Sequence, residues 1–250
     1  MGSTTNSLIA LSGETSGGTP DRRELDQLLA TGEQQSAALM AMELGRQGCP
    51  AVSFTGAQAG FLAGGPWGEG RILSVNPVRV EEACASGRVA VVTGFQAATA
   101  SGDTITLGRG GSDTSAVAIA AKCGCPCEIL SDVPGVYTCD PNRFPARKLD
   151  YITYDEMLEL SSLGAKVLHS RAVEIAKKYS VDLYCASTFS DERGTRVVNS
   201  LPEWLEQPVV TGITGDENQA RVSIARMPAS MEAMSALFGA LAERGVHVDM

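Results

Sequence analysis

Apolar residues near the start of the chain recur at helical spacing. Between Pro20 and Gly48 they are Leu25, Leu28, Leu29, Leu39, Met42 and Leu44. Intervals of three and four positions predict a helix with one apolar face. The pattern contains Thr31-Gly32-Glu33, and because glycine weakens a helix interior, we expect a break that presents Glu33. A solvated Glu33 on a helix surface is the alternative interpretation.

Short, continuous apolar runs further along the chain predict strands. They are Ala51–Phe54, Arg71–Val75, Val89–Thr93, Cys127–Leu130 and Val181–Thr188. The run VAVVT does not alternate with polar residues, which is typical of strands buried on both faces.

Helical segments alternate with these strands. We expect them at Pro77–Ser86, at 113–124, and on either side of Gly164, with the last helix ending near Tyr179. Thr153-Tyr154-Asp155-Glu156 matches a capping box at the start of the third. The alternation predicts an α/β fold, a three-layer sandwich around a mainly parallel sheet.

The pattern changes after a linker-like segment, Ser200–Pro208. Strands are predicted at Val209–Thr214 and Gln219–Ala225, a helix at Met231–Gly245, and the start of a third strand at Val246–Met250. We therefore expect a domain at 1–200, a linker at 201–208 and a second, α+β unit at 209–250. A C-terminal hairpin and helix packed on the main domain is the alternative.

Composition narrows the classes of partner. The net charge is −9 without a basic cluster, which argues against nucleic acid or an anionic membrane as partner. No apolar run approaches the roughly 20 residues of a membrane span, and the N-terminus does not resemble a signal peptide. We therefore expect a cytoplasmic protein with a small-molecule partner.

Seven cysteines are an odd number and suit reduced thiols better than a disulfide framework. The run CGCPC at Cys123–Cys127 raises the question of zinc. Cys127 opens a strand-like run, no second ligand pair has metal spacing, and both histidines lie far away in sequence. We therefore expect no metal held by cysteines.

The segment Thr106–Asp113, TLGRGGSD, is the strongest local signal for chemistry. Its glycines allow turns that leave backbone amides facing outward, and Ser112 or Asp113 can cap the helix that follows. A helix N-terminus favours phosphate or carboxylate, and Arg109 adds a bidentate cation. The segment predicts an anion site; a glycine-rich surface turn with a solvated Arg109 is the alternative.

Ligand sites in parallel sheets lie at the carboxyl ends of strands. Loops follow the predicted strands at Gly94–Gly111, at Ser131–Pro145 and from Ser187 onward. The first two contain most of the candidate polar residues, so we expect them to share one crevice.

A series of ordered motifs resembles the aspartate kinases of the amino-acid kinase family. The motifs are RELDQLLATGEQ at Arg23, AVSFTGAQAG at Ala51, GFQ at Gly94, TLGRGGSDTSAVAIAA at Thr106, SDVPGVYTCDP at Ser131 and YDEMLELSSLGAKVLHSRAVEIAKKY at Tyr154. Together they span roughly residues 1–200. The resemblance implies transfer of the ATP γ-phosphoryl group to the side-chain carboxylate of L-aspartate, the first step of lysine, threonine and methionine biosynthesis.

The resemblance also implies roles for residues of this sequence. Glu33 would meet the amino group of aspartate and Asp113 would organise phosphoryl transfer, with Lys166 near the ATP phosphates. The other residues implied to hold aspartate are Thr5, Phe95, Arg109, Gly110, Gly111 and Ser112. Those implied to bind the nucleotide are Ser131, Asp132, Tyr137, Thr138, Cys139, Asp140, Pro141, Asn142 and Arg143, with Lys166. Mg²⁺ would bridge the phosphates, held partly by ATP itself.

The sequence departs from the family at several positions. The family's first strand and its KFGGTS loop, which supplies a phosphate-binding lysine, have no counterpart before Thr5. Ala97, Ser170 and the pair Asn142-Arg143 stand where glycine, proline and a single arginine are usual. Val209–Met250 resembles the opening of a regulatory ACT domain. We therefore expect a chain shortened at both ends, a homo-oligomer, and a lysine or threonine effector only if the ACT region is complete.

Two alternatives to an aspartate kinase remain open at this point. One is another amino-acid kinase of the same fold, for acetylglutamate or glutamate; Glu33 and the ACT-like tail favour aspartate. The other is a non-catalytic regulatory subunit that binds nucleotide without turnover, because the phosphate-binding lysine loop has no counterpart.

Overall fold

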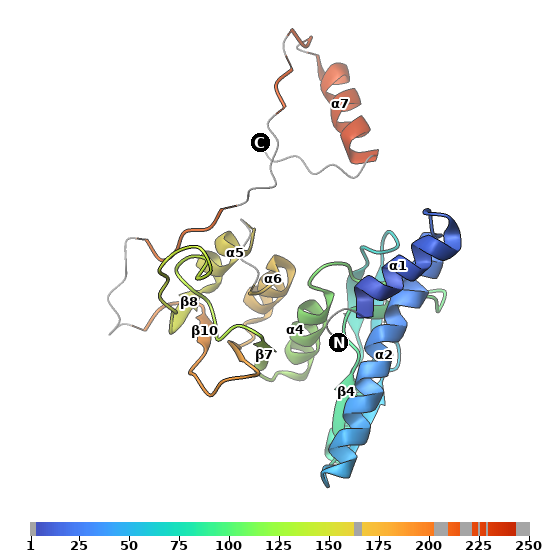
Figure 1. The fold of residues 1–250 in the computed structure, drawn as a ribbon, viewed down its shortest axis with the longest axis vertical. Coiled ribbons are helices and arrows are strands. Elements are labelled where there is room, and N and C mark those ends of the chain that lie inside the picture. Colours follow the sequence, from blue (N-terminus) through green and yellow to red (C-terminus); the bar gives the residue numbers. More distant parts are fainter. Residues whose placement is uncertain are drawn as a thin grey trace. The chain divides into compact units, whose positions relative to one another are not determined.

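The computed structural model describes residues 4–162, 167–202, 210–215, 222–224, 226–228 and 230–243. Contacts divide the chain into two units, Met1–Gly215 and Asp216–Met250. The candidate site lies in the first unit, where helices and strands alternate along the chain (Figure 1).

The helices of the first unit are α1 (Thr4–Ser16), α2 (Arg22–Arg46), α3 (Val78–Ala85), α4 (Gly111–Cys123), α5 (Tyr154–Ser162) and α6 (Ser170–Tyr179). Its strands are β1 (Ala51–Phe54), β2 (Phe61–Gly64), β3 (Arg71–Val75), β4 (Val89–Val92), β5 (Gln96–Ala98), β6 (Thr104–Thr106), β7 (Cys127–Ser131), β8 (Tyr151–Thr153), β9 (Leu183–Ser187) and β10 (Thr195–Val198).

The strands of the first unit pair in three sheets. Strands β1 and β4 form a parallel pair, and the other two sheets have the orders β3-β2-β5-β6 and β7-β9-β10-β8. Pairs β7–β9, β8–β10 and β2–β5 are parallel, whereas the β2–β3, β5–β6 and β9–β10 pairs are antiparallel. The predicted α/β class is confirmed, with short antiparallel additions to the parallel pairs.

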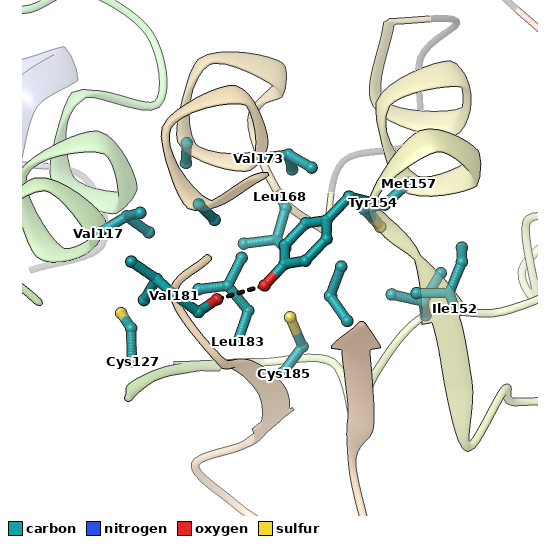
Figure 2. Close-up of a cluster of buried hydrophobic side chains, with 14 of the residues drawn as sticks. Val117, Cys127, Ile152, Tyr154, Met157, Leu168, Val173, Val181, Leu183 and Cys185 are labelled. Carbon is teal, nitrogen blue, oxygen red and sulfur yellow. Dashed lines mark hydrogen bonds between the residues drawn. The ribbon is translucent and has the colours of Figure 1, made fainter. Parts of the chain in front are cut away.

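Two apolar cores meet at α4. One core combines α5 and α6 with the sheet β7-β9-β10-β8, and Val117 and Ala120 belong to it. In that core the hydroxyl of Tyr154 donates to the carbonyl of Val181 (Figure 2). The other core combines α3 with β1, β2 and β5, and Ala118 belongs to it. Because α4 packs into both cores, its N-terminus is held from two sides.

Helix α2 is continuous from Arg22 to Arg46, so the predicted break at Thr31-Gly32-Glu33 is wrong. The reason is a helix–helix contact. A Cβ at Gly32 would lie 3.3 Å from Cγ2 of Thr4 and 3.5 Å from Cδ1 of Leu8. Glycine is used here to let α1 approach α2 closely, and this packing outweighs its low helix propensity.

Three helix caps, one of α5 and two of α4, can be compared with their predictions. The capping box is confirmed, because Glu156 accepts from the amide of Thr153 at 2.8 Å while Thr153 Oγ1 accepts from the amide of Glu156 at 3.3 Å. Gly124 ends α4 in the left-handed conformation, as predicted. The capping of α4 by Ser112 or Asp113 is wrong: the N-cap is Gly110, in the left-handed conformation and without a side-chain cap.

Several short strands were missed by sequence reasoning. Strand β2 lies in the glycine-rich stretch between the predicted strands Ala51–Phe54 and Arg71–Val75, and the β5–β6 hairpin lies within the predicted loop Gly94–Gly111. Strands β8 and β10 were not anticipated. Strands of three or four residues show too little alternation to be recognised.

The C-terminal expectations are met in part. Helix α7 (Met231–Glu243) confirms a helix in this region. No strand is formed by residues 210–215 or 222–224, so the described parts of two predicted strands are wrong. The third predicted strand, Val246–Met250, lies outside the described residues, as does most of the linker.

No helix within the described ranges is both long enough and apolar enough to cross a membrane.

Candidate functional site

The segment Thr106–Asp113 turns sharply into α4. Gly108 and Gly110 have φ values of 73° and 66°, a region that other residues seldom adopt. The amide of Gly111 bonds the carbonyl of Gly108 at 3.0 Å. The next two amides, of Ser112 and Asp113, have no acceptor among the described residues, as expected in the first turn of a helix. They supply the outward-facing donors of an anion site.

Arg109 lies at the tip of this turn. It is exposed, and no carboxylate within the described ranges forms an ion pair with it. Ser112 is also exposed, so one guanidinium, one hydroxyl and two amides are available at the same helix end. This combination suits a carboxylate or phosphate ligand.

The N-terminus of α6 abuts the same turn. A Cβ on Gly110 would lie 2.2 Å from Cβ of His169, the N-cap residue of α6. The backbone and the imidazole of His169 favour the charged form of the Asp113 carboxyl group and so lower its pKa. Burial nevertheless raises the pKa of Asp113, and the contacts with His169 only partly offset this. Two helix N-termini and a half-buried carboxylate therefore meet at Gly110.

Phe95 is tied to the first turn of α4. It has a φ of 70°, its amide donates to Oγ of Ser115 at 3.2 Å, and its carbonyl accepts from the amide of Leu107 at 2.8 Å. The loop after β4 thus reaches the helix end that carries Ser112. Just before it, the hydroxyl of Thr93 is buried without a partner in the described part of the chain.

Glu33 and Thr5 belong to the adjacent helices α2 and α1. Glu33 is half-buried, and burial raises the pKa of its carboxyl group. No described cation forms an ion pair with it. Thr5 is exposed in the first turn of α1, next to the residue that contacts Gly32. A half-buried carboxylate without a cation suits the amino group of a ligand.

A buried carboxylate that sequence reasoning missed binds the backbone just before the Arg109 turn. Asp26 of α2 is 1% exposed. Its oxygens accept hydrogen bonds from the amides of Gly68 (2.9 Å) and Thr106 (2.8 Å) and from the Thr106 hydroxyl (2.8 Å). A carboxylate next to the apolar positions Leu25, Leu28 and Leu29 was the available signal.

Arg171 of α6, which sequence reasoning also missed, binds the same backbone region. Its guanidinium donates to the carbonyls of Leu107 (2.6 Å) and Gly70 (3.0 Å). Burial lowers the pKa of Arg171. No local sequence pattern predicts that Arg171 binds these carbonyls, because they are more than sixty residues away in the chain.

The predicted nucleotide loop is held by local bonds and by a bond from the amide of Ile213 to the carbonyl of Thr138 at 2.7 Å. Oδ1 of Asp140 accepts from the amide of Asn142 at 2.9 Å. The backbone carbonyl of Asp140 accepts from the amides of Arg143 and Phe144 at 3.1 Å. Thr138 pairs with Arg147 across the loop at 2.9 and 3.1 Å.

The remaining residues of the predicted nucleotide site make both local and long-range contacts. Oγ of Ser131 accepts from the amide of Val133 at 3.2 Å, and its carbonyl accepts from the amide of Thr188 at 2.8 Å. Asp132 and Pro141 are exposed, Cys139 is half-exposed, and Tyr137 forms an isolated bridge with Lys148. Lys166 lies outside the described residues.

Two cavities of the first unit lie away from the predicted site residues. One, of about 250 Å³, lies beside Asp26 and Trp67; another, of about 240 Å³, lies at the C-terminal ends of α4 and α6. No group of three or more histidine, cysteine or acidic side chains in the described ranges could hold a metal ion. The candidate site is therefore defined by the polar groups around Gly110.

Comparison with known proteins places these features in a family. Residues 1–187 match the model of the amino acid kinase family. The chain belongs to this family. Its TLGRGGSD turn, α4 and the Asp140 loop all lie within the matched residues.

Curated relatives of this family member are aspartokinases. Those of Thermus thermophilus and Geobacillus stearothermophilus are 48% and 45% identical over the whole chain, which covers 62% and 61% of their lengths. The aspartokinase of Mycobacterium tuberculosis is 43% identical, with 60% covered. The chain thus spans about three fifths of the length of these relatives.

Solved structures agree on the fold. The aspartate kinase of Synechocystis has a TM-score of 0.69 and 48% identity, with 81% of this chain and 33% of that chain covered. Aspartokinase III of Escherichia coli in complex with aspartate and ADP has a TM-score of 0.78 over 98% of this chain and 56% of that chain; at 23% identity it supports the fold alone. The amino-acid kinase fold is confirmed.

Proposed function

We propose that the chain carries the catalytic region of an aspartate kinase, which transfers the γ-phosphoryl group of ATP to the side-chain carboxylate of L-aspartate. The observation that carries this proposal is the helix end at Gly110. It combines Arg109, which forms no ion pair within the described ranges, with two amides that have no acceptor there, and it lies in a chain that is 48% identical to an aspartokinase.

Recognition of aspartate follows from the charges around this helix end. L-Aspartate carries two carboxylates and one ammonium group. Arg109, with the amides and hydroxyl at Ser112, provides the donors for a carboxylate. Glu33 provides the half-buried anion for the ammonium group. Phe95, Gly110 and Gly111 shape the backbone between them, and Thr5 contributes a hydroxyl from α1.

The reaction needs positioning and charge neutralisation more than covalent chemistry. An oxygen of the aspartate side chain forms a bond to the γ-phosphorus while the bond to the β–γ bridging oxygen breaks and ADP leaves. The amides of the first turn of α4 stabilise the charge that spreads over the transferred group. Asp113, at the junction of α4 and α6, orients the groups at this centre.

ATP binding is assigned to the loop that follows β7, from Ser131 to Arg143, with Lys166 near the phosphates. Mg²⁺ neutralises the charge of the phosphates when it is bound with ATP. The donor set fits an ion carried by the nucleotide, since Asp113 supplies one carboxylate and no described cluster forms a complete protein cage. This agrees with the preference of Mg²⁺ for phosphates, water and one or two carboxylates.

Acetylglutamate is the less suitable substrate, because its nitrogen is a neutral amide. A half-buried Glu33 carboxylate that forms no ion pair with a described side chain favours a substrate with a free ammonium group. A non-catalytic subunit would bind nucleotide without turnover, and the assay below separates that possibility.

Further features of the relatives extend the proposal. We assign residues 1–200 to the kinase domain and 209–250 to the start of an ACT-like regulatory region. Lysine occurs in a complex of aspartokinase III of Escherichia coli. We propose a cytoplasmic homo-oligomer of lysine, threonine and methionine biosynthesis, in which a lysine or threonine effector requires a complete ACT region.

The test is a coupled assay of ADP release with MgATP and L-aspartate. Parallel reactions contain L-glutamate, N-acetyl-L-glutamate or no acceptor. We expect L-aspartate to be the preferred acceptor, with turnover on the order of 1 s⁻¹ or more. Nucleotide binding without turnover on any acceptor would favour the non-catalytic reading. A preference for N-acetyl-L-glutamate would contradict the role given to Glu33.

A further inference from the structure

Two backbone segments meet next to the candidate site. One is Gly68–Gly70, in the loop between β2 and β3, and the other is Thr106–Leu107, which leads into the turn that carries Arg109. They share a direct bond, from the amide of Gly70 to the carbonyl of Thr106 at 2.8 Å. They are more than thirty residues apart in sequence, so other contacts must keep them in register.

Two charged side chains bridge these segments with complementary chemistry. Asp26 accepts from one amide of each segment, those of Gly68 and Thr106. Arg171 donates to one carbonyl of each segment, those of Gly70 and Leu107. Each uses two bonds from a planar, charged group, which fixes orientation as well as distance.

The two side chains come from the helices that carry the rest of the site. Asp26 lies seven residues before Glu33 on α2, which places both on the same face about 10 Å apart. Arg171 lies two residues after His169, whose side chain covers Gly110. A third contact joins α2 to this region, because the Gln96 amide donates to the carbonyl of Ala30 at 2.9 Å.

We propose that Asp26 and Arg171 are a pair of positioning residues that set the place of Arg109 relative to Glu33 and the α6 N-terminus. Asp26 couples the Arg109 turn to the helix of Glu33, and Arg171 couples it to the helix of His169. This inference rests on the proposed function, in which Arg109 and Glu33 hold the two ends of aspartate. Neither positioning residue is required to touch a substrate.

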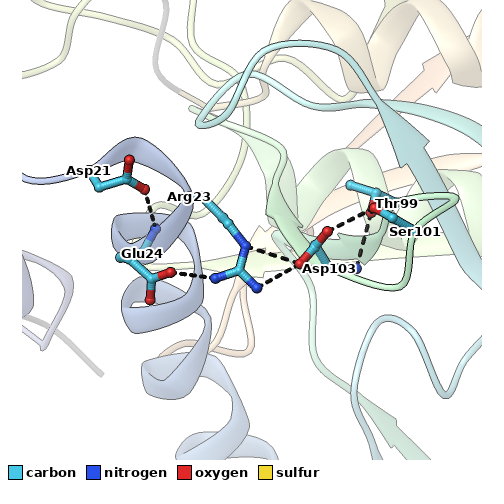
Figure 3. Close-up of polar contacts among 6 residues, drawn as sticks. All are labelled: Asp21, Arg23, Glu24, Thr99, Ser101 and Asp103. Carbon is cyan, nitrogen blue, oxygen red and sulfur yellow. Dashed lines mark hydrogen bonds and ion pairs between the residues drawn. The ribbon is translucent and has the colours of Figure 1, made fainter.

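The chain offers a matched control. Arg23 of α2 also reaches the β5–β6 region, where it donates to Asp103 from Nε at 3.0 Å and Nη2 at 2.6 Å (Figure 3). This contact joins the same two elements, but it is at the surface and engages the hairpin turn instead of the Arg109 segment. Asp103→Asn therefore removes a charged tie between α2 and the hairpin without touching the proposed pair.

The experiment compares the wild-type chain with Asp26→Asn, Arg171→Lys and Asp103→Asn. Affinities for L-aspartate and for MgATP are measured by calorimetry, and unfolding is followed in urea. We expect Asp26→Asn and Arg171→Lys each to weaken aspartate binding at least tenfold and MgATP binding less than threefold. Asp103→Asn should change either affinity less than twofold. Equal loss of both affinities in a folded variant would overturn the proposal, as would unchanged aspartate affinity.

A second measurement separates positioning from general destabilisation. If Asp26 acts through Arg109, Asp26→Asn should weaken aspartate binding less than twofold in an Arg109→Ala background. An undiminished tenfold effect in that background would contradict the proposal.

Hydrogen exchange tests the pair without any substrate. In Asp26→Asn and in Arg171→Lys, the amides of residues 104–112 should exchange faster than in the wild-type chain. The increase should be at least ten times the increase measured for the amides of β9. If the wild-type chain binds no aspartate, the proposed function fails, and exchange alone then decides the positioning role. Unchanged exchange in 104–112 would overturn it.

Discussion

The two halves of the candidate site are held in different ways. The Arg109 turn is fixed by long-range bonds to its backbone from the buried Asp26 and from the half-buried Arg171 and Phe95. The loop around Asp140 is fixed mainly by bonds between residues two to nine positions apart, at exposed or half-exposed residues, together with a bond from the amide of Ile213 to the carbonyl of Thr138. Buried charged hydrogen bonds resist opening far more than exposed local turns. We therefore expect the half assigned to aspartate to be preformed, and the half assigned to the nucleotide to adjust to its ligand.

The largest expected effect comes from Gly110→Ala. An alanine there meets both a positive φ and the side chain of His169, so we expect a loss of about 3 kcal/mol or more in the free energy of unfolding. Aspartate binding should fall below detection. Urea unfolding and calorimetry measure the two effects.

Gly124→Ala is the control for that change. Gly124 ends the same helix with a similar φ of 64°, but a Cβ there meets no atom within 4 Å. We expect a cost of only about 1 kcal/mol and normal aspartate affinity. Equal costs at the two glycines would show that the contact with His169 has no energetic weight.

Arg109→Ala should have the next largest effect. Loss of a charged, bidentate donor should lower kcat/KM for aspartate about 100-fold, corresponding to about 3 kcal/mol, with KM for MgATP changed less than threefold. Arg46→Ala removes an exposed arginine paired with Glu43 on the far part of α2 and serves as control. Equal loss for aspartate and ATP would contradict the assigned role.

Asp140→Ala probes the adjustable half. It removes the bonds to Asn142, at a cost of about 1 kcal/mol or less in stability because the loop is exposed. We expect a several-fold weaker affinity for MgATP and an unchanged affinity for aspartate in calorimetric titrations. A matching loss of aspartate affinity would mean that the two halves are one cooperative unit.

The smallest effect concerns pH. Burial raises the pKa of Asp113 in the folded state, so the folded chain binds more protons than the unfolded chain between the two pKa values. Stability therefore falls as pH rises through that window. Asp113→Asn should be more stable than wild type at pH 7 in urea unfolding, by a margin that shrinks at acidic pH, while kinase activity is lost. A margin that grows in acid would reverse the sign and refute the argument.

Local signals in the sequence were sufficient for much of the fold. The capping box at Thr153 and the helix stop at Gly124 use neighbouring residues only, and both are confirmed. Gly32 misled the prediction because its role is a contact with Thr4 and Leu8, which no local pattern records. The three-residue strands β5 and β6 are stabilised by their mutual pairing, so they too escaped detection.

In the candidate site, too, features that depend on neighbouring residues could be predicted, whereas long-range contacts could not. The glycine-rich turn predicted outward-facing amides, and the amides of Ser112 and Asp113 have no acceptor among the described residues. The anion site itself stays a prediction, since an exposed Arg109 fits the alternative of a surface turn equally well. The support of the glycine-rich turn was missed, because Asp26 and Arg171 act on partners 42 to 101 residues away. The roles of Thr5, Glu33 and the nucleotide loop stay predictions until they are tested by binding.

The most direct test of a preformed aspartate half is calorimetric titration of the chain with L-aspartate in the absence of nucleotide. The account predicts binding of one aspartate per chain without ATP, and at least tenfold weaker binding to Arg109→Ala. Aspartate binding that appears only after MgATP is added, or that is equal in Arg109→Ala, would contradict it.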